Sequence, residues 1–304
     1  AVTSTSGPGF ALKSEALGLS VMAELPLVVV NVQRGGPSTG LPTKTEQSDL
    51  LQTLYGRNGE SPIVVLAAST PSDCFYYAFL AAKIALERMV PVVLLTDGFL
   101  GNGSEPWRVP SMSELPPIKP RIAQNPELFK PYRRDPETLA REWAIPGMEG
   151  FQHRIGGLEK NVAGGVSHDP ENHQINTDLR AQKVERVVEM IPELKVDGEP
   201  EGDLLVVGWG GTYGHMVSSV REMQEQGKKV SLAHFNYIKP LPKNTAEVFS
   251  KFKKIVVCEL NMGQFAAYLR DKVPGYTYYQ VNKVKGLPFS VHELVENFEK
   301  IMEA

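Results

Sequence analysis

Apolar residues along the first hundred positions follow two alternating patterns. Short β-branched runs predict buried strands over residues 27–33, 62–67 and 90–95, and helical spacing predicts helices over 11–24, 46–55 and 71–89. The third helix has a start signal, because Thr70 is a capping residue, Pro71 follows in the first turn, and Asp73 lies three residues on. This alternation predicts a parallel sheet covered by helices.

The same alternation returns after residue 202. Strands are predicted over 203–208, 229–234, 254–259 and 276–281, and helices over about 214–226, 243–252, 263–273 and 290–303. A strict strand–helix order indicates a second parallel sheet with helices on both faces. The fold class is therefore α/β, with two parallel-sheet α/β domains and no evident internal repeat.

The segment between the two patterns is different. Residues 105–177 are dense in proline and lose hydrophobic periodicity, which is typical of a lid, an interface arm or a linker. An amphipathic helix is predicted over 178–192, and the Gly- and Pro-containing stretch 193–202 is typical of a domain linker. We therefore expect a first domain over 1–177, a helix and linker over 178–202, and a second domain over 203–304.

Composition excludes several classes of protein. The net charge of −3 provides no basic field for nucleic acid. No apolar run approaches the ~20 residues that a membrane span needs. Only two cysteines occur, Cys74 and Cys258, which excludes a disulfide framework and a zinc or iron–sulfur centre held by a cysteine cluster. We expect a cytoplasmic protein that itself holds no metal.

The strongest chemical signal is the polar loop that follows the strand over 27–33. Arg34 stands at the carboxyl end of that strand, where ligands bind in open α/β sheets. An arginine holds a carboxylate or phosphate through two parallel hydrogen bonds, which lysine cannot do. Ser38, Thr39 and Thr43 add hydroxyls and Lys44 adds a second cation, a set that suits a dianionic substrate. The alternative is that Arg34 and Lys44 are solvated residues of a flexible loop.

Three other motifs have structural alternatives. The turn Thr5-Ser6-Gly7-Pro8-Gly9-Phe10 lies between a strand end and a helix, so it either binds a ligand through hydroxyl and N–H groups or caps the helix. Gly208–Gly214 departs from the dinucleotide fingerprint, since Tyr213 stands at its sixth position; a structural or interface turn is favoured over NAD binding. His168–His173 has no preset metal geometry, and a loop that touches a partner or closes a site is favoured.

Two stretches together resemble a known family. They are Thr3–Phe10 and Val32–Asp49, the second with the sequence Gln-Arg-Gly-Gly-Pro-Ser-Thr-Gly-Leu-Pro-Thr-Lys-Thr-Glu-Gln-Ser-Asp after Val32. They resemble the α subunit of 2-oxoacid:ferredoxin oxidoreductases. The Thr-Lys-Thr-Glu-Gln version and Gly56-Arg57-Asn58-Gly59-Glu60 are most similar to the 2-oxoglutarate type, and Asp97–Leu100 and Gly103–Trp107 also fit. The second half matches generically.

The resemblance implies a pyrimidine-binding domain for thiamine diphosphate, followed by a transketolase-C-terminal-like domain. A separate β subunit would bind the diphosphate with Mg²⁺ and carry a [4Fe–4S] cluster, in a dimer of heterodimers. The implied reaction converts 2-oxoglutarate and CoA to succinyl-CoA and CO₂, with electrons passing to ferredoxin. The alternatives are an enzyme for pyruvate or branched 2-oxoacids and a non-catalytic assembly module.

The resemblance also implies residue roles. It places Arg34 at the substrate carboxylate and implies that the turn over Ser6–Phe10 lines the thiamine ring. We expect Lys44 or a neighbouring hydroxyl to meet the distal carboxylate of 2-oxoglutarate, and we assign no catalytic residue. The family's aminopyrimidine-binding glutamate and its Tyr-Pro-Ile-Thr-Pro turn have no counterpart here. Because the chain opens at Ala1 without methionine, we expect it to be the C-terminal part of a longer polypeptide.

Overall fold

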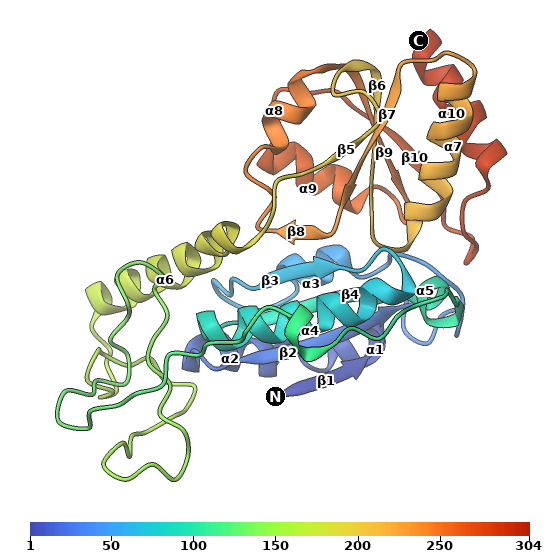
Figure 1. Cartoon of the computed structure of the whole chain (residues 1–304). Helices are drawn as coiled ribbons and strands as arrows, with labels where there is room; N and C mark the ends of the chain where they lie inside the picture. Colours follow the sequence, from blue (N-terminus) through green and yellow to red (C-terminus); the bar gives the residue numbers. More distant parts are fainter.

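The computed structural model describes residues 1–304, whose helices and strands form two α/β units stacked one on the other (Figure 1). The first sheet has five strands in the order β1-β2-β4-β3-β8. These are β1 (Val2–Thr5), β2 (Leu27–Gln33), β3 (Val64–Ala67), β4 (Pro91–Asp97) and β8 (Tyr237–Lys239). Neighbouring strands are parallel, except that β8 pairs antiparallel with β3.

The second sheet has the order β10-β9-β6-β7-β5. Its strands are β5 (Val196–Asp197), β6 (Gly202–Trp209), β7 (Val230–Phe235), β9 (Phe252–Glu259) and β10 (Tyr278–Asn282). All pairs are parallel except β5 with β7. The predicted α/β class with two parallel-dominated sheets is confirmed. Each sheet also ends in a short antiparallel edge strand, which the sequence could not predict because two or three residues show no period.

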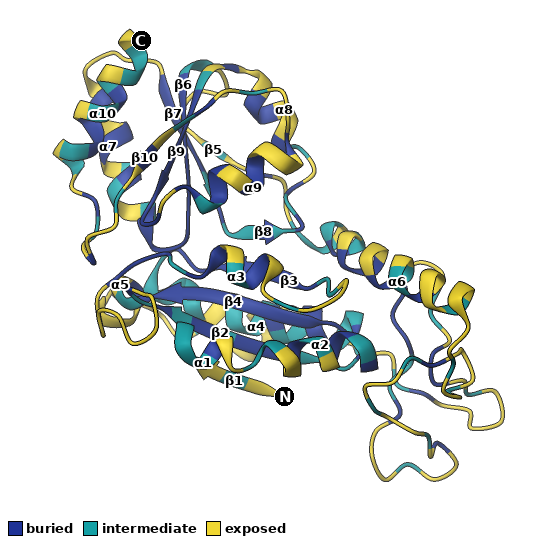
Figure 2. Cartoon of the chain, turned by 180° about the vertical axis from the view of Figure 1, so that it is seen from behind, coloured by how far each residue is buried: buried dark blue, intermediate teal, exposed yellow.

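Ten α-helices surround the sheets. They are α1 (Gly7–Ala11), α2 (Ser14–Ala23), α3 (Leu50–Tyr55), α4 (Pro71–Arg88), α5 (Gly98–Asn102), α6 (Pro170–Glu185), α7 (Tyr213–Glu225), α8 (Thr245–Ser250), α9 (Gln264–Lys272) and α10 (Val291–Glu303). The central strands β3, β4 and β6 are the most continuously buried elements, whereas the edge strand β1 is largely exposed (Figure 2). One core cluster joins side chains of both sheets, such as Val65 of β3 and Val257 of β9. The two units are therefore packed through a shared apolar core.

Two helices begin four or more residues from their predicted starts. Helix α6 begins at Pro170 rather than at 178, because Asp169 caps it: the Asn172 N–H donates to the Asp169 carboxylate at 2.7 Å. Its first two turns contain Ile175 among polar residues, and one apolar side chain sets no spacing, so the pattern could not reveal them. Helix α3 begins at Leu50 rather than at 46, because the Gln47 N–H donates to the Leu260 carbonyl (3.0 Å) across the two units instead of to a helical partner.

Residues 103–169 form an arm with one 3₁₀ turn, Met112–Glu114. The arm first runs along α4, where the Lys83 Nζ donates to the Pro117 carbonyl at 2.6 Å, and then extends away from both sheets (Figure 1). The arm is held by Glu24, a fully buried carboxylate at the end of α2. Glu24 pairs with Arg134 of the arm and with Lys183 of α6, and its carbonyl accepts from the Arg141 Nε at 3.0 Å. No helix of the chain combines the length and apolar character of a membrane span.

Candidate functional site

The carboxyl ends of three parallel strands meet at one edge of the first sheet. Strand β1 leads into α1, β2 ends beside Arg34, and β4 ends at Asp97. A cavity of about 710 Å³ and another of about 410 Å³ open at this edge, and Arg34 lines both. In open α/β sheets this is the edge at which ligands bind.

Arg34 is half-buried and has a guanidinium without a protein partner. It forms no ion pair, and its Nε is buried without an acceptor. A buried donor left without a partner costs about 1–3 kcal/mol, so the arrangement favours a ligand that supplies acceptors. A carboxylate or phosphate matches the planar fork of the guanidinium.

The loop after Arg34 folds back on itself. The Gly35 N–H donates to the Lys44 carbonyl at 2.9 Å. Ser38 and Thr43 have left-handed backbones (φ 53° and 64°), and a Cβ at Gly40 would lie 2.1 Å from the Gly35 carbonyl oxygen. Non-glycine residues rarely hold this conformation without support, and such strain clusters at ligand sites.

The predicted substrate residues of this loop separate in the structure. Ser38 lines the larger cavity and Thr43 the smaller one, both together with Arg34. Thr39 and Lys44 line neither. The Lys44 side chain is exposed, and its Cβ lies 2.9 Å from where a Cβ on Gly286 would stand. The role of Lys44 toward a distal carboxylate thus stays a prediction that the cavity geometry does not support.

The predicted cofactor turn divides in a similar way. Thr5 and Ser6 line the smaller cavity, and Gly7 and Pro8 line the larger one. Gly9 has no room for a side chain, since a Cβ would stand 1.9 Å from the Thr5 Oγ1, and Phe10 is 1% exposed within the core. Only the first part of the turn therefore faces a ligand.

Asp49 is a buried carboxylate that connects the turn, the strand and the loop. Its Oδ2 accepts from the Asn31 Nδ2 at 3.0 Å and its Oδ1 from the Ser48 Oγ at 3.0 Å. The same hydroxyl lies 2.8 Å from the Arg34 carbonyl, and a Cβ on Gly7 would stand 2.9 Å from the Asp49 Oδ2. Burial raises the pKa of Asp49.

Gln47 joins this loop to the second unit and is fully buried. Its side-chain amide donates to the Trp209 carbonyl (2.7 Å) and accepts from the Leu260 N–H (2.9 Å). Its backbone carbonyl accepts from the Asn261 Nδ2 at 2.9 Å, and the Ser48 carbonyl accepts from the Gln264 Nε2 at 3.0 Å. The cavity that contains Arg34 is therefore built from both units.

The glycine turn after β6 is an interface turn, as the sequence favoured over a dinucleotide site. The Gly211 N–H donates to the buried Asp97 Oδ2 at 3.2 Å, and a Cβ on Gly211 would stand 2.2 Å from that oxygen. Asp97 also caps α5 and accepts from the Thr45 hydroxyl at 3.2 Å. Burial raises the pKa of Asp97.

Sequence reasoning missed Asn31, Gln47 and Asp49 as site residues. A polar Asn31 inside an otherwise apolar strand was the available signal, since buried polar groups need partners. Arg57 of the Gly56–Glu60 motif has a structural role, because it donates to the Thr53 carbonyl (2.6 Å) at the end of α3. The chain contains no group of three His, Cys, Asp or Glu side chains that could hold a metal.

Comparison with known proteins identifies relatives of this chain. Residues 1–168 match the family described as pyruvate flavodoxin/ferredoxin oxidoreductase, thiamine diphosphate-binding. The chain is 54% identical to the 2-oxoglutarate oxidoreductase subunit KorA of Mycobacterium tuberculosis, over 96% of this chain and 45% of that protein. It is 30% identical to the 2-oxoglutarate synthase subunit KorA of Archaeoglobus fulgidus, over 92% of this chain and 74% of that one.

A solved structure has the same fold. The 2-oxoglutarate:ferredoxin oxidoreductase of Magnetococcus marinus, with 2-oxoglutarate, coenzyme A and succinyl-CoA bound, superposes with a TM-score of 0.94 at 31% identity. The superposition covers 99% of this chain and 53% of that one. The chain thus spans about half the length of the mycobacterial subunit and of the Magnetococcus chain.

Proposed function

The chain belongs to the pyruvate flavodoxin/ferredoxin oxidoreductase family, and we propose that it is the α portion of a 2-oxoglutarate:ferredoxin oxidoreductase. The reaction is oxidative decarboxylation of 2-oxoglutarate with CoA, which gives succinyl-CoA, CO₂ and two electrons for ferredoxin. The names of the relatives and the ligands of the Magnetococcus structure support this choice of substrate. The observation within the chain that carries the proposal is Arg34, a guanidinium without a protein partner at the carboxyl edge of the sheet.

Arg34 binds the C1 carboxylate in this proposal. Two parallel hydrogen bonds would fix the carboxylate plane and so orient the bond that breaks. Ser48 and Asp49 hold the backbone that carries Arg34 without pairing with its guanidinium. The guanidinium charge therefore stays available to the substrate.

The residues near α1 fit one side of a thiamine ring. Thr5, Ser6 and Pro8 provide hydroxyls and an apolar edge beside the two cavities. Gly7 and Gly9 are explained by contacts within the chain, so the cofactor proposal rests on Thr5, Ser6 and Pro8 and on the family match. Thiamine diphosphate, when bound, supplies the electron sink for decarboxylation of a 2-oxoacid.

We assign the diphosphate, its Mg²⁺ and the [4Fe–4S] cluster to a partner β subunit. An exposed aromatic cluster supports a protein interface: the Phe75 and Trp107 ring centroids are 5.1 Å apart and those of Phe75 and Tyr76 are 5.6 Å apart. Aromatic residues are enriched in interfaces. The proposed assembly is a cytoplasmic dimer of heterodimers.

The test uses the purified native complex that contains this chain. Viologen or ferredoxin reduction is measured with 2-oxoglutarate and CoA, with pyruvate as the comparison substrate. CoA-dependent reduction that prefers 2-oxoglutarate supports the proposal, and preference for pyruvate reassigns the substrate. No reduction with any 2-oxoacid, in a complex that contains cofactor and cluster, would favour an assembly module.

Arg34→Lys tests the assigned residue. A charge-assisted hydrogen bond contributes about 1.5–3 kcal/mol, so we expect kcat/KM to fall about 10- to 100-fold. Arg221→Lys, an exposed change on α7, is the matched control and should leave kcat/KM unchanged. Unchanged kcat/KM in Arg34→Lys, in a complex of normal size on gel filtration, would remove Arg34 from the substrate site.

A further inference from the structure

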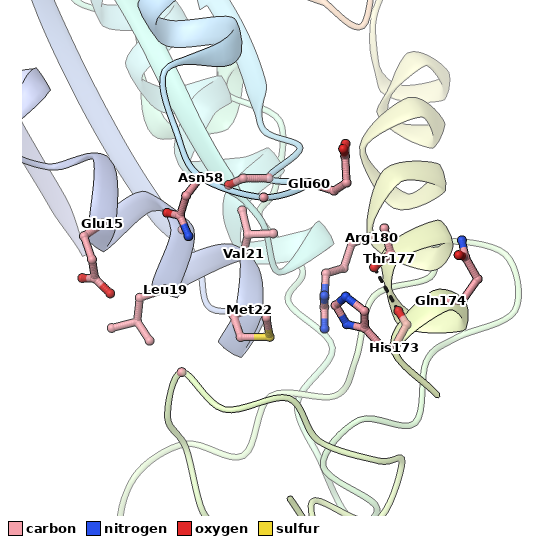
Figure 3. Close-up of a pocket in the computed structure, with 14 residues that line it drawn as sticks. Glu15, Leu19, Val21, Met22, Asn58, Glu60, His173, Gln174, Thr177 and Arg180 are labelled. Carbon is pink, nitrogen blue, oxygen red and sulfur yellow. Dashed lines mark hydrogen bonds between the residues drawn. The ribbon is translucent and has the colours of Figure 1, made fainter. Parts of the chain in front are cut away.

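A groove lies between α6 and residues 56–61, at the amino end of the first sheet and thus at the edge opposite Arg34. It consists of two adjoining cavities of about 500 and 610 Å³. They share Gly59, Glu60, Ser61, Gln174 and Thr177, so the groove is continuous. Figure 3 shows its first part, with Asn58 and Glu60 on one side of the opening and Gln174, Thr177 and Arg180 of α6 on the other. We name it the α6 groove.

Both sides of the α6 groove are held in place. Arg57 ties residues 56–61 to α3, through bonds to the Leu54 carbonyl (3.0 Å) and the Ser61 carbonyl (2.9 Å). Helix α6 is tied to α2 by the buried Lys183–Glu24 pair. A polar opening that persists between two fixed elements is preformed, as ligand sites usually are.

The unpaired charge in the α6 groove is mainly negative. Glu15, Glu60 and Glu185 are exposed carboxylates that form no ion pair with this chain. Asp178 is a fourth exposed carboxylate of the groove without an ion pair. Of the four cations, Arg180 pairs with Glu159 and Lys272 pairs with Asp271 at 2.9 Å, whereas Lys239 and Arg57 have no carboxylate partner, because Arg57 donates to neutral carbonyls. Carboxylates without an ion pair thus outnumber cations without one. The groove is therefore complementary to a positively charged partner.

The dimensions of the α6 groove match an extended peptide. The helix residues that line it run from His173 to Glu185, which at 1.5 Å per residue is about 18 Å. An extended chain rises about 3.3 Å per residue, so about five residues fill that length. At the α2 end, Leu19, Val21 and Met22 provide an apolar contact (Figure 3).

We propose that the α6 groove binds an extended segment of a partner protein, about five residues long, that carries Lys or Arg and one apolar side chain. The basic side chains would pair with Glu60 and with the carboxylates at the two ends, Glu15 and Glu185. The apolar side chain would contact Leu19 and Met22. The site involves none of the residues assigned to substrate or cofactor, so it goes beyond the proposed function and does not depend on it.

The first test measures binding of a fluorescent five-residue probe peptide, made of Lys and Arg with one Leu, to the purified native complex by anisotropy. In the triple variant Glu15→Gln, Glu60→Gln, Glu185→Gln we expect the Kd to rise about 3- to 100-fold, since three exposed charge pairs of modest strength are lost. The exposed Glu171→Gln, on the same helix but outside the groove, should leave the Kd unchanged. Equal binding of a matched Glu/Asp peptide, or a triple variant that binds like the parent complex, would overturn the proposal.

A second measurement addresses the case in which a partner segment already occupies the α6 groove in the purified complex, so that added peptide has no free site. A photo-cross-linker on Ala181→Cys, within the groove, is compared with one on Glu171→Cys, outside it. Cross-links from position 181 alone to a Lys- or Arg-containing segment of a partner chain support the proposal. Cross-links to acidic or purely apolar segments, or no cross-link together with no peptide binding, overturn it.

Discussion

Gln47 should contribute several kilocalories per mole to the free energy of unfolding, because its side chain joins the Arg34 loop to the second unit. Gln47→Ala leaves the buried Leu260 N–H without an acceptor and removes the bond to the Trp209 carbonyl. That carbonyl still accepts from the Thr212 hydroxyl at 2.8 Å, so only one group becomes unsatisfied. An unsatisfied buried donor costs about 1–3 kcal/mol and a lost hydrogen bond about 1 kcal/mol. We therefore expect the free energy of unfolding to fall by about 2–4 kcal/mol.

Urea unfolding measures this loss, and the buried Trp209 is an intrinsic fluorescent probe at the affected interface. Gln47→Met preserves volume while it removes both side-chain hydrogen bonds, so it should lose nearly as much as Gln47→Ala. Gln182→Ala, an exposed change on α6, is the matched control and should stay within about 0.5 kcal/mol of the parent. If Gln47→Met is no less stable than Gln182→Ala, the two units are not held together by this side chain.

Three further predictions follow from the buried carboxylates and a close glycine contact. Burial alone would raise the pKa of Glu24, but the paired Lys183 and Arg134 lower this pKa from 4.5 to about 2. The stabilisation that the Glu24 carboxylate provides is therefore present above pH 4.5 and is lost as the pH falls toward about 2. Glu24→Gln should lower the free energy of unfolding by about 3–5 kcal/mol at pH 7. Acid unfolding of this variant, followed by circular dichroism, should depend less steeply on pH than that of the parent, and an equally steep dependence would contradict the prediction. Asp49→Asn should lower kcat/KM of the complex about tenfold, since it weakens the support of Arg34 by about 1.4 kcal/mol, and unchanged kinetics would exclude that role. Gly211→Ala should lower stability by about 1–3 kcal/mol through its clash with Asp97. Gly214→Ala, which meets nothing within 4 Å, is its control in thermal unfolding.

The sequence could predict the repeating part of the fold because that part is set by local pattern. The apolar β-branched run before Gln33 became β2, and Thr70 caps α4 with its hydroxyl accepting from the Asp73 N–H at 3.3 Å. Edge strand β8 could not be predicted, since its pairing with β3 depends on a partner about 170 residues away. The start of α3 also depends on a tertiary contact. Local helical spacing predicted a start at residue 46, but the Gln47 N–H donates to the Leu260 carbonyl, and the helix begins at Leu50.

The candidate site was predictable where one residue type implies one chemistry. Arg34 stood out as a cation at a strand end, and the structure gives it two cavities and no protein partner. Lys44 was chosen by proximity in sequence, but the turn through Ser38 and Gly40 directs it to the second unit instead. Asp49 escaped notice because its partners, Asn31 and Gly7, come from separate elements that only the folded chain brings together.

Strand β8 also has a consequence for the order in which this polypeptide matures on the ribosome. The outer edge of β3 is covered by residues 237–239, which emerge long after the rest of the first sheet has been synthesised. Until then, β3 presents an apolar, unpaired edge of the kind that templates aggregation. A nascent chain that stalls before residue 237 should therefore need chaperone protection, whereas release after that point lets the chain cover the edge itself.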